Sequence, residues 1–309
     1  MLALAYRGTS SPVIRLLAAF LCAALSLGAV AADKPAKARK VAAIADVTRD
    51  GEPNLLSSGV FVLDPVSGQT LFAKNAEHAA PIASITKLMT AMVVVDAHLA
   101  MDEAIELTIE DIDAVKNTRS RLPIGVHFRR DDLLRLALMA SDNRAASALG
   151  RSYPGGIQAF VAAMNEKAKT LGLTQTQYVD SSGLSAGNVS SPADLGKLVA
   201  AASSYPMIRE YSTTGAVNVR LPDSKRQLHF VNTNALVRSS DWKIGLSKTG
   251  YINEAGKCLV MQAMIANQPI VIVLLDSWGR LTRIGDANRI KRWLEKNPSK
   301  VLASPLRSG

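Results

Sequence analysis

Cysteine is nearly absent from this 309-residue sequence, which contains only Cys22 and Cys258. Cys22 lies in an N-terminal segment that we expect to be removed, so Cys258 would remain alone and no internal disulfide could form. The residues around Cys258 have the pattern of an apolar strand and include no histidine. We therefore interpret it as a small core residue rather than a nucleophile.

The sequence also lacks the patterns of metal sites and of the common serine hydrolases. Its four histidines have no ligand spacing and form no H-E-x-x-H motif, so the sequence implies no metal and no cofactor. A Gly-x-Ser-x-Gly motif is missing as well, which leaves a Ser-His-Asp hydrolase poorly supported. We detect no internal repeat.

Acidic residues are missing from the first 32 positions, which contain Arg7, Arg15 and then an uncharged apolar run over 16–32. A membrane-spanning helix needs about 20 apolar residues. This run is shorter and ends in small residues, including Ala29-Val30-Ala31. We therefore predict a cleavable signal peptide over residues 1–32 and a secreted protein with at most loose membrane association.

Charge and composition indicate how the rest of the chain is organised. Loss of the signal would leave 34 basic and 26 acidic residues, a net charge of +8. This charge suits an anionic polymer or a membrane surface, and export argues against nucleic acid as a partner. Residues 33–54 are rich in Lys, Arg, Ala and Pro, which predicts a flexible basic linker. A folded domain would follow over 55–297, with a short C-terminal tail over 298–309.

The apolar patterns predict an α+β fold. Turn residues 64–68 separate two strand-like runs and predict a hairpin, and three later runs predict an antiparallel meander. Because strands lie near both ends of the chain and helices lie between them, we expect a sheet flanked by helices with an inserted helical subdomain. The expected helices are 85–100, 131–139, 145–149, 157–171 and 286–296, and the expected strands are 60–63, 69–73, 242–251, 258–266 and 270–275.

A possible nucleophile lies at the start of the first predicted helix, in the tetrapeptide Ser84-Ile85-Thr86-Lys87. Its hydroxyl and amine are three residues apart and would meet on one helical turn. A neutral lysine can take the proton of a serine hydroxyl, and burial favours the neutral form. The same spacing recurs at Ser240 and Lys243, where no helix is predicted, so the tetrapeptide alone is a weak signal.

Two further motifs strengthen the prediction, because Ser141-Asp142-Asn143 and Lys248-Thr249-Gly250 follow in order. Alone, the first is typical of a helix cap and the second of a strand end before a turn. Together, the three motifs are the set found in penicillin-binding proteins and β-lactamases.

The sequence resembles that superfamily and, more narrowly, the low-molecular-mass D-alanyl-D-alanine endopeptidases and carboxypeptidases. The resemblance runs from about residue 59 to 293 and includes PIASITKLMT at 81–90, LMASDNRAA at 138–146 and KTGY at 248–251. It implies a β-lactamase/transpeptidase-like fold, a catalytic penicillin-binding domain over 55–297 and a periplasmic location. Its implied partners are the D-alanyl cross-links and D-Ala-D-Ala termini of peptidoglycan, with β-lactams as inhibitors.

The resemblance also implies a role for each motif residue. Ser84 would be the acylated nucleophile, Lys87 its base and Ser141 a proton relay to the departing amine. Asn143 would hold the acyl-side amide of the substrate, while Lys248, Thr249 and Gly250 would bind beside the substrate carboxylate. The backbone amides of Ser84 and Tyr251 would form the oxyanion hole. We also expect the charge of Lys248 to help keep Lys87 neutral.

Three other functions remain open. A β-lactamase needs a base that hydrolyses its acyl-enzyme, and here Glu166 and Glu210 lack the E-x-x-L-N context that supplies one. A non-catalytic wall-binding protein is disfavoured because no motif residue is missing. A carboxypeptidase would use the same residues as an endopeptidase. The chain shows no additional C-terminal β domain or anchor helix, which favours the endopeptidase.

Overall fold

The computed structural model describes residues 45–221 and 226–302. The predicted signal peptide, residues 33–44 of the predicted linker and residues 303–309 of the predicted tail lie outside this range. The strands are β1 Gly59–Leu63, β2 Thr70–Lys74, β3 Ala80–Pro81, β4 Ala104–Glu106, β5 His127–Arg129, β6 Val189–Ser190, β7 Ala216–Arg220, β8 Gln227–Val231, β9 Ile244–Ile252, β10 Gly256–Ile265 and β11 Gln268–Ser277. The helices are α1 Thr86–Asp96, α2 Arg130–Met139, α3 Asn143–Arg151, α4 Gly156–Thr170, α5 Pro192–Ala202, α6 Pro206–Ser212, α7 Thr282–Lys296 and α8 Pro298–Leu302, with 3-10 turns η1 Ala83–Ile85, η2 Ile109–Asp111 and η3 Ala235–Arg238.

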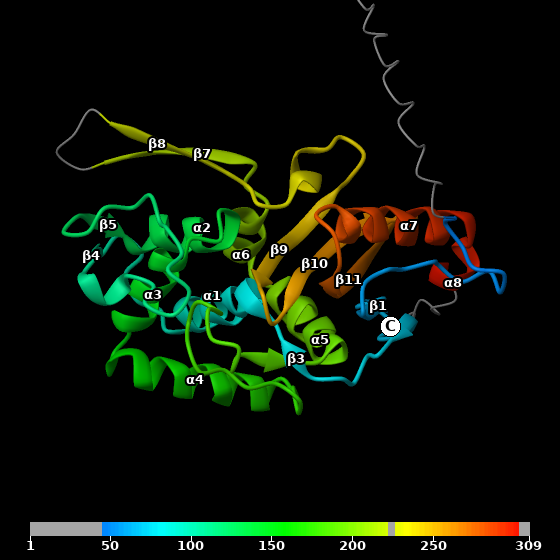
Figure 1. Cartoon of the computed structure of the whole chain (residues 1–309), viewed down its shortest axis with the longest axis horizontal. Helices are drawn as coiled ribbons and strands as arrows, with labels where there is room; N and C mark the ends of the chain where they lie inside the picture. Colours follow the sequence, from blue (N-terminus) through cyan, green and yellow to red (C-terminus); the bar gives the residue numbers. More distant parts are fainter. Residues whose placement is uncertain (1–44, 222–225, 303–309) are drawn as a thin grey trace, which may run out of the picture. The chain divides into compact units, whose positions relative to one another are not determined.

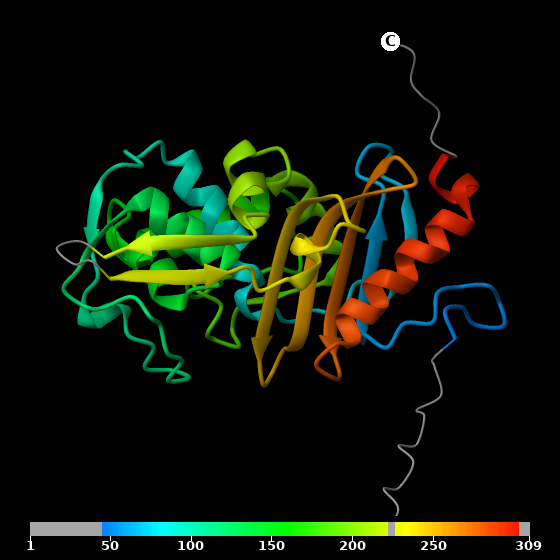
Figure 2. The ribbon, with the colours of Figure 1, turned by 90° about the horizontal axis from the view of Figure 1, so that it is seen from above.

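The main sheet has five antiparallel strands in the order β2-β1-β11-β10-β9 (Figures 1 and 2). The predicted hairpin supplies β1 and β2, and the predicted meander supplies the other three strands, so strands from both ends of the chain meet between β1 and β11. Among the described residues, β9 pairs only with β10, and its other edge is unpaired. The sheet therefore ends at the strand that carries the third motif.

The two faces of the sheet bury different hydrophobic clusters. Along β10, Leu259 and Met261 belong to a cluster with Trp293 of α7, whereas Cys258 and Val260 belong to the larger cluster that includes α1 and α5. This division follows from the two-residue period of a strand. Cys258 is fully buried, which confirms the prediction of a core residue.

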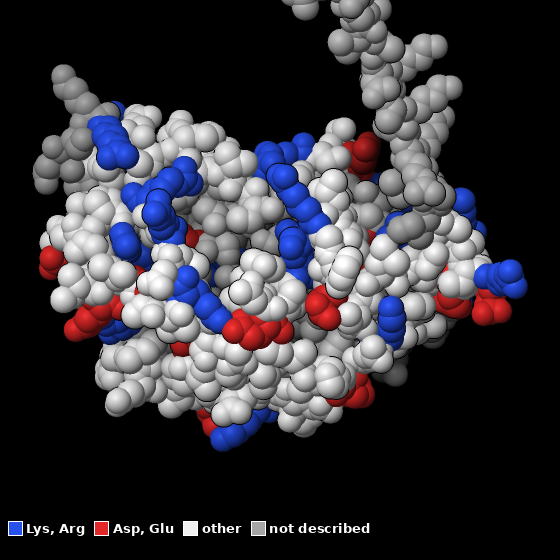
Figure 3. All heavy atoms as spheres, in the orientation of Figure 1, with Lys and Arg blue, Asp and Glu red and all other residues white. Residues whose placement is uncertain are grey.

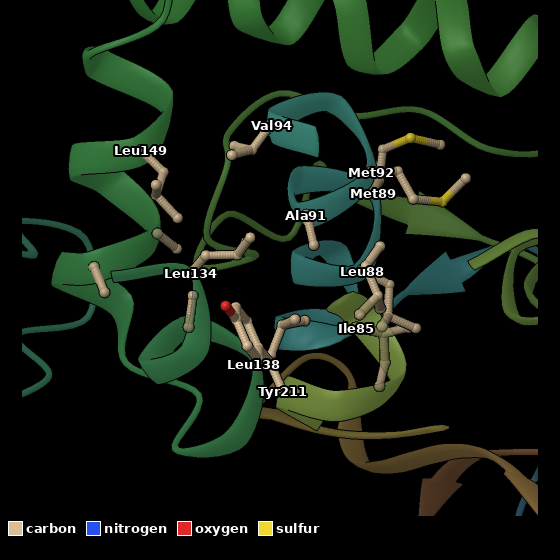
Figure 4. Close-up of a cluster of buried hydrophobic side chains, with 14 of the residues drawn as sticks. Ile85, Leu88, Met89, Ala91, Met92, Val94, Leu134, Leu138, Leu149 and Tyr211 are labelled. Atoms are coloured by element: carbon tan, nitrogen blue, oxygen red, sulfur yellow. The ribbon is translucent and has the colours of Figure 1, made fainter. Parts of the chain in front are cut away.

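Helix α1 occupies the centre of the helical part of the fold. Nine of its eleven residues are buried, so it is surrounded by packing partners instead of presenting one apolar stripe. Figure 4 shows Leu88, Ala91 and Val94 of α1 among side chains of α2, α3 and α6. The polar side chains at the start of α1 are therefore buried in the interior, namely Thr86, Lys87 and Thr90, whereas Asp96 at its end is exposed.

The structure differs from the predicted elements in several places, and the short strand pairs β3–β6 and β4–β5 were also not predicted. Helix α1 ends at Asp96 instead of near residue 100, and α5, α6 and the β7–β8 hairpin were not predicted. The hairpin alternates buried Val219, Leu228 and Phe230 with exposed residues, and it extends over the side of the molecule that carries α2 (Figures 1 and 2). These strands are only five residues long, which explains why so weak an alternation was overlooked.

Residues 45–54, which we assigned to the flexible linker, make defined contacts with α7. Arg292 donates hydrogen bonds to the carboxylate of Asp46, and the Trp293 indole donates to the carbonyl oxygen of Gly51 at 2.9 Å. The linker boundary at residue 54 is therefore too late in the chain. At the other end, the predicted irregular tail begins with the short helix α8. No helix in the described ranges is long and apolar enough to cross a bilayer.

Asp286 of α7 holds the segment before β1 against the sheet. Its fully buried carboxylate accepts hydrogen bonds from the backbone N–H groups of Leu56 and Ser57, from the Ser57 hydroxyl and from Arg289. We predict that Asp286→Ala lowers the free energy of unfolding by about 3 kcal/mol, because it leaves buried donors and a cation without a partner. Chemical denaturation measures this change.

Asp46→Ala is the matched control, since it removes an exposed carboxylate that pairs with Arg292 on the same helix. Exposed ion pairs contribute about 1 kcal/mol or less. Equal losses of stability in the two variants would contradict the importance assigned to Asp286.

Candidate active site

The first motif lies where η1 leads into α1, beneath the start of the helix. Ala83 has a left-handed backbone with φ of 49°, and this turn directs the half-buried Ser84 to the boundary of the sheet and the helical part. One turn later, Nζ of Lys87 donates a hydrogen bond to Oγ of Ser84 at 2.9 Å. The pairing predicted from the three-residue spacing is present.

Two segments far along the chain complete the surroundings of Lys87. Its Nζ donates to Oδ1 of Asn143 at 2.7 Å and to the backbone oxygen of Ser182 at 2.6 Å, and the side chain is fully buried. Burial lowers the pKa of Lys87 to about 7, although the carboxylates of Asp180, Asp142 and Asp113 oppose the shift. A large fraction of Lys87 is therefore neutral near pH 7.

The second motif forms the tight connection between α2 and α3. Ser141 has φ of 57°, and Asp142 caps α3 by accepting a hydrogen bond from the N–H of Ala145 at 2.9 Å. The cap brings Asn143 into the first turn of α3, beside Lys87. Nδ2 of Asn143 donates to Oγ1 of Thr118 at 2.8 Å. The second motif thus caps α3 through Asp142, and it also places Asn143 beside Lys87.

The third motif lies on the edge strand β9. Nζ of the buried Lys248 donates to Oγ of Ser141 at 2.7 Å and to the backbone oxygen of Thr249 at 2.9 Å. Burial, and next the charge of Lys87, hold the pKa of Lys248 well below its usual range. Burial is the main cause for Lys87 as well, so the expected tuning of Lys87 by the charge of Lys248 is not its principal determinant.

Gly250 allows β9 to pack directly against the turn that carries Ser84. A Cβ atom at this position would lie 2.9 Å from the backbone oxygen of Ile82 and 3.2 Å from the backbone nitrogen of Ser84. The glycine of the third motif is thus explained by a close approach of two backbones. The next residue, Tyr251, is exposed over 57% of its surface, so only its backbone can belong to the interior of the site.

Sequence reasoning gave no role to several groups that contact the motifs, among them the backbone oxygen of Ser182, the hydroxyl of Thr118 and the hydroxyl of Thr233, which accepts a hydrogen bond from Thr249 at 2.7 Å. Only the Ser182 segment carries a local signal. Asp180 and Gly183 bracket a turn in which the carboxylate of Asp180 accepts hydrogen bonds from the N–H groups of Ser182 and Gly183, both at 2.6 Å.

The remaining residues that the sequence analysis considered, Ser240, Lys243, Glu166 and Glu210, lie away from the three motifs. Ser240 and Lys243 are exposed residues in the loop before β9, so the second Ser-x-x-Lys match is not part of the site. Glu166 lies on α4 beside Lys169, and Glu210 lies on α6 beside Arg135. Neither glutamate contacts the motif residues.

The sequence profile of the D-alanyl-D-alanine carboxypeptidases matches residues 46–278. This chain belongs to that family. It is 45% identical to a D-alanyl-D-alanine endopeptidase of Pseudomonas aeruginosa over 79% of both chains. It is 41% identical to the D-alanyl-D-alanine endopeptidase of Escherichia coli, over 88% of this chain and 87% of that protein.

Solved structures confirm the predicted fold of this family member. The Streptomyces K15 DD-transpeptidase superposes with a TM-score of 0.74 at 28% sequence identity, covering 80% of this chain and 98% of that one. A D-alanyl-D-alanine carboxypeptidase of Mycobacterium tuberculosis superposes with a TM-score of 0.71, also at 28% identity, over 78% of this chain and 91% of that one. The expected α+β transpeptidase-like architecture is therefore correct.

Gly183 offers a test of how the loop after Asp180 supports Lys87. It has φ of +81°, and a Cβ atom there would lie 2.0 Å from the backbone oxygen of Ala83. We predict that Gly183→Ala destabilises the protein by about 3 kcal/mol, from backbone strain and overlap together. It should also slow acylation by penicillin at least tenfold, because the carbonyl of Ser182 must move.

Gly68→Ala is the matched control. Gly68 has nearly the same φ, +77°, but no atom lies within 4 Å of the added methyl group. In this variant, backbone strain alone should lower the free energy of unfolding by about 1 kcal/mol, and the rate of acylation by penicillin should be unchanged. Equal effects of the two substitutions on acylation would refute the role of the close contact.

Proposed function

We propose that this protein is a secreted serine D-alanyl-D-alanine endopeptidase that cleaves the D-alanyl cross-links of peptidoglycan through an acyl-enzyme on Ser84. The observation that carries the proposal is the position of Lys87. A single buried amine contacts the hydroxyl of the first motif and the amide of the second, and its pKa is near 7. Family membership and the two endopeptidase relatives support the choice of substrate.

In the proposed acylation step, neutral Lys87 takes the proton of Ser84, and Oγ attacks the carbonyl carbon of the D-alanine on the acyl side of the scissile bond. The backbone N–H groups of Ser84 and Tyr251 would donate hydrogen bonds to the developing oxyanion. The approach of Gly250 to the nitrogen of Ser84 supports this pairing, since it brings the two backbones together.

The unpaired edge of β9 supports a binding mode in which the substrate peptide adds to the sheet as another strand. Asn143 would hold the acyl-side amide, exchanging its contact with Thr118 for one with the substrate. Both a D-alanyl cross-link and a D-Ala-D-Ala terminus present a carboxylate beside the scissile amide. That carboxylate would lie against Lys248, Thr249 and Gly250, and it would raise the pKa of Lys248.

Departure of the amine needs a proton, which we assign to Ser141. Its Oγ accepts a hydrogen bond from Lys248 at 2.7 Å and can pass a proton to the leaving nitrogen as the carbon–nitrogen bond breaks. Lys248 replaces the proton that Ser141 gives up, Lys87 releases the proton of Ser84 to solvent, and Lys248 regains a proton from solvent. Water then attacks the ester of Ser84 while neutral Lys87 takes its proton, and Lys87 returns this proton to Oγ of Ser84 as the ester bond breaks and the acid product leaves. Protons and bonds are thus balanced over the two steps.

Penicillin would acylate Ser84 in the same way and remain attached. Neither Glu166 nor Glu210 contacts the motif residues. The carboxylate of Asp180 accepts five hydrogen bonds, all from backbone N–H groups and side chains of residues 182–188 in its own loop. The site therefore offers no obvious dedicated base for rapid hydrolysis of the penicilloyl ester, which argues against a β-lactamase.

A carboxypeptidase is the second candidate, and the family description favours it. The same residues would remove a terminal D-alanine, so the distinction depends on how the leaving peptide is accommodated. We place the endopeptidase first because the two relatives at 41–45% identity carry that name.

We further propose that the protein is exported to the periplasm and that residues 1–32 are removed as a signal peptide. Basic side chains are prominent on the face shown in Figure 3, around the β7–β8 hairpin and beside β9. A cationic surface of this kind favours an anionic polymer, and peptidoglycan peptides carry several carboxylates.

The nucleophile is tested by mass spectrometry after incubation with penicillin. We predict a stable adduct on the peptide that contains Ser84 and none in Ser84→Ala, which should also lose at least about 10³-fold in the rate of cross-link cleavage. Purified cross-linked dimers and monomeric pentapeptides, supplied separately, show which bond is cut. An unmodified Ser84 in the wild-type protein would favour a non-catalytic wall-binding protein, and rapid turnover of a chromogenic cephalosporin would favour a β-lactamase.

The pKa of Lys87 predicts the pH dependence of acylation. Because protonated Lys87 cannot accept the proton of Ser84, the second-order rate of acylation by penicillin should rise about tenfold per pH unit below pH 7 and level off above it. Lys87→Arg, which stays charged, should be inactive throughout this range. A midpoint near 10.5, the ordinary lysine value, would rule out a buried neutral base.

A further inference from the structure

A pocket of about 320 Å³ lies at one end of the main sheet, where the β9–β10 turn adjoins the loop from β11 to α7. Its walls include Tyr251, Asn253, Lys257, Asp276 and Trp278, and we call it the Trp278 pocket. Ligand sites of proteins have volumes of about 300 Å³ and upward, so it has room for one ring of a larger ligand. None of the steps above uses its side chains.

The Trp278 pocket continues the edge of the sheet that carries the third motif. Tyr251 of β9 pairs with Lys257 of β10, and Lys257 pairs with Ser277 of β11, so these residues form one row across the sheet. This row lies at the lower end of the strands in Figure 2. Gly250 faces the turn that carries Ser84, and side chains alternate along a strand, so Tyr251 points to the other face. The pocket therefore begins one residue beyond the third motif.

The direction of the bound substrate follows from the contacts assigned to it. Lys248 and Thr249 would hold the carboxylate beside the scissile amide, and the N–H of Tyr251 would hold the carbonyl oxygen on the acyl side. The acyl part of the peptide thus runs past Tyr251 toward the end of β9. In peptidoglycan the N-terminus of this peptide is attached to an amino sugar of a glycan strand, so the sugar lies in the direction of the pocket. This step rests on the proposed function.

Aromatic side chains at the pocket are unusually exposed. Trp278 is 88% exposed, more than any other large hydrophobic residue in the described ranges, and Tyr251 is 57% exposed. The Trp278 indole forms no hydrogen bond and no ring contact with any described residue. Exposed hydrophobic residues gathered around a concave surface mark binding sites more often than scattered ones do. The face of an aromatic ring is negatively polarised and attracts C–H groups, which one face of a sugar ring presents.

Polar groups beside these rings match the hydroxyl and acetamido groups of an amino sugar. Nζ of Lys257 lies 4.6 Å from the centroid of the Tyr251 ring, and the Tyr251 hydroxyl donates to Oδ1 of Asn253 at 3.0 Å. The carboxylate of Asp276 accepts a hydrogen bond from Ser58 at 2.8 Å. A bilayer would remove water from this carboxylate, amide and ammonium without replacing their hydrogen bonds. The pocket therefore suits a sugar better than a lipid surface.

We infer that the Trp278 pocket binds an amino sugar of the glycan strand that carries the donor peptide. The Trp278 indole would stack on one face of the sugar ring, while Asn253 and Lys257 would form hydrogen bonds with its hydroxyl and acetamido oxygens. The enzyme would then prefer cross-links whose donor peptide is still attached to a strand. The pocket thus selects intact cell wall over peptides that have been released from it.

The test uses purified cross-linked peptide dimers that differ only in the attachment of the amino-sugar disaccharide of peptidoglycan. One dimer carries it on the donor peptide, one on the acceptor peptide and one on neither. We expect kcat/KM of the donor-linked dimer to exceed that of the bare dimer about tenfold, mainly through KM, as one stacked aromatic contact provides. The acceptor-linked dimer should match the bare dimer. Equal values for all three, or a gain with the acceptor-linked dimer alone, would overturn the inference.

Trp278→Ala should lower the ratio of the donor-linked to the bare dimer from about tenfold to about one, whereas Trp278→Phe, which keeps an aromatic face, should retain most of it. Leu281→Ala serves as the control, since Leu281 is a 70% exposed apolar residue that lies between β11 and α7 and does not line the pocket. This control should keep the wild-type ratio. Because the ratio does not depend on the amount of folded enzyme, an unchanged value in Trp278→Ala would contradict the sugar site.

A lipid contact and a failure of the proposed function give different results. If the donor-linked and bare dimers react equally and Trp278→Ala weakens co-sedimentation with phosphatidylglycerol vesicles, the loop binds lipid and the inference is wrong. If Ser84 forms no penicillin adduct and no dimer is cleaved, both proposals are overturned. If the adduct forms and the dimers are cleaved equally well, the enzyme assignment stands and the sugar site alone is refuted.

Discussion

The burial of Lys87 is the constraint on which the rest of the site depends. A lysine with no exposed surface is tolerated only if its amine finds acceptors and if much of the population loses its charge. The three acceptors come from the turn before α1, from the start of α3 and from the loop after Asp180. Packing around α1 therefore has a chemical consequence, because the same enclosure that stabilises the helical part lowers the pKa of Lys87 to about 7, as its proposed role as a base requires.

Several backbone features serve this enclosure. Ala83 and Ser141 both adopt left-handed conformations, which non-glycine residues adopt at some cost, and each lies next to or within a motif. Gly183 and Gly250 allow two further segments to contact the same turn from different sides. The site is thus built by close approaches of backbone to backbone, which side chains of ordinary size would prevent.

The substrate-facing side of the site combines three different surfaces. The edge of β9 offers unpaired backbone groups, Lys248 and Ser141 form a polar pair beside it, and the Trp278 pocket at the end of β9 presents an exposed aromatic side chain. An extended peptide would meet these surfaces in order along its length.

The three motifs, their order and most of the elements that carry them could be predicted from the amino-acid sequence, because each motif coincides with a local signal: a helix start, an N-cap and a strand. The β9–β11 meander and the β1–β2 hairpin could also be predicted, because local strand and turn signals mark both of them. The pKa of Lys87, the contacts with Ser182, Thr118 and Thr233, and the fit of Gly250 against Ser84 became visible only in the folded protein. The same is true of the packing of residues 46–53 on α7. These features depend on burial and on contacts between backbone atoms of segments that are distant in the sequence. The residue type at a single position does not predict such contacts.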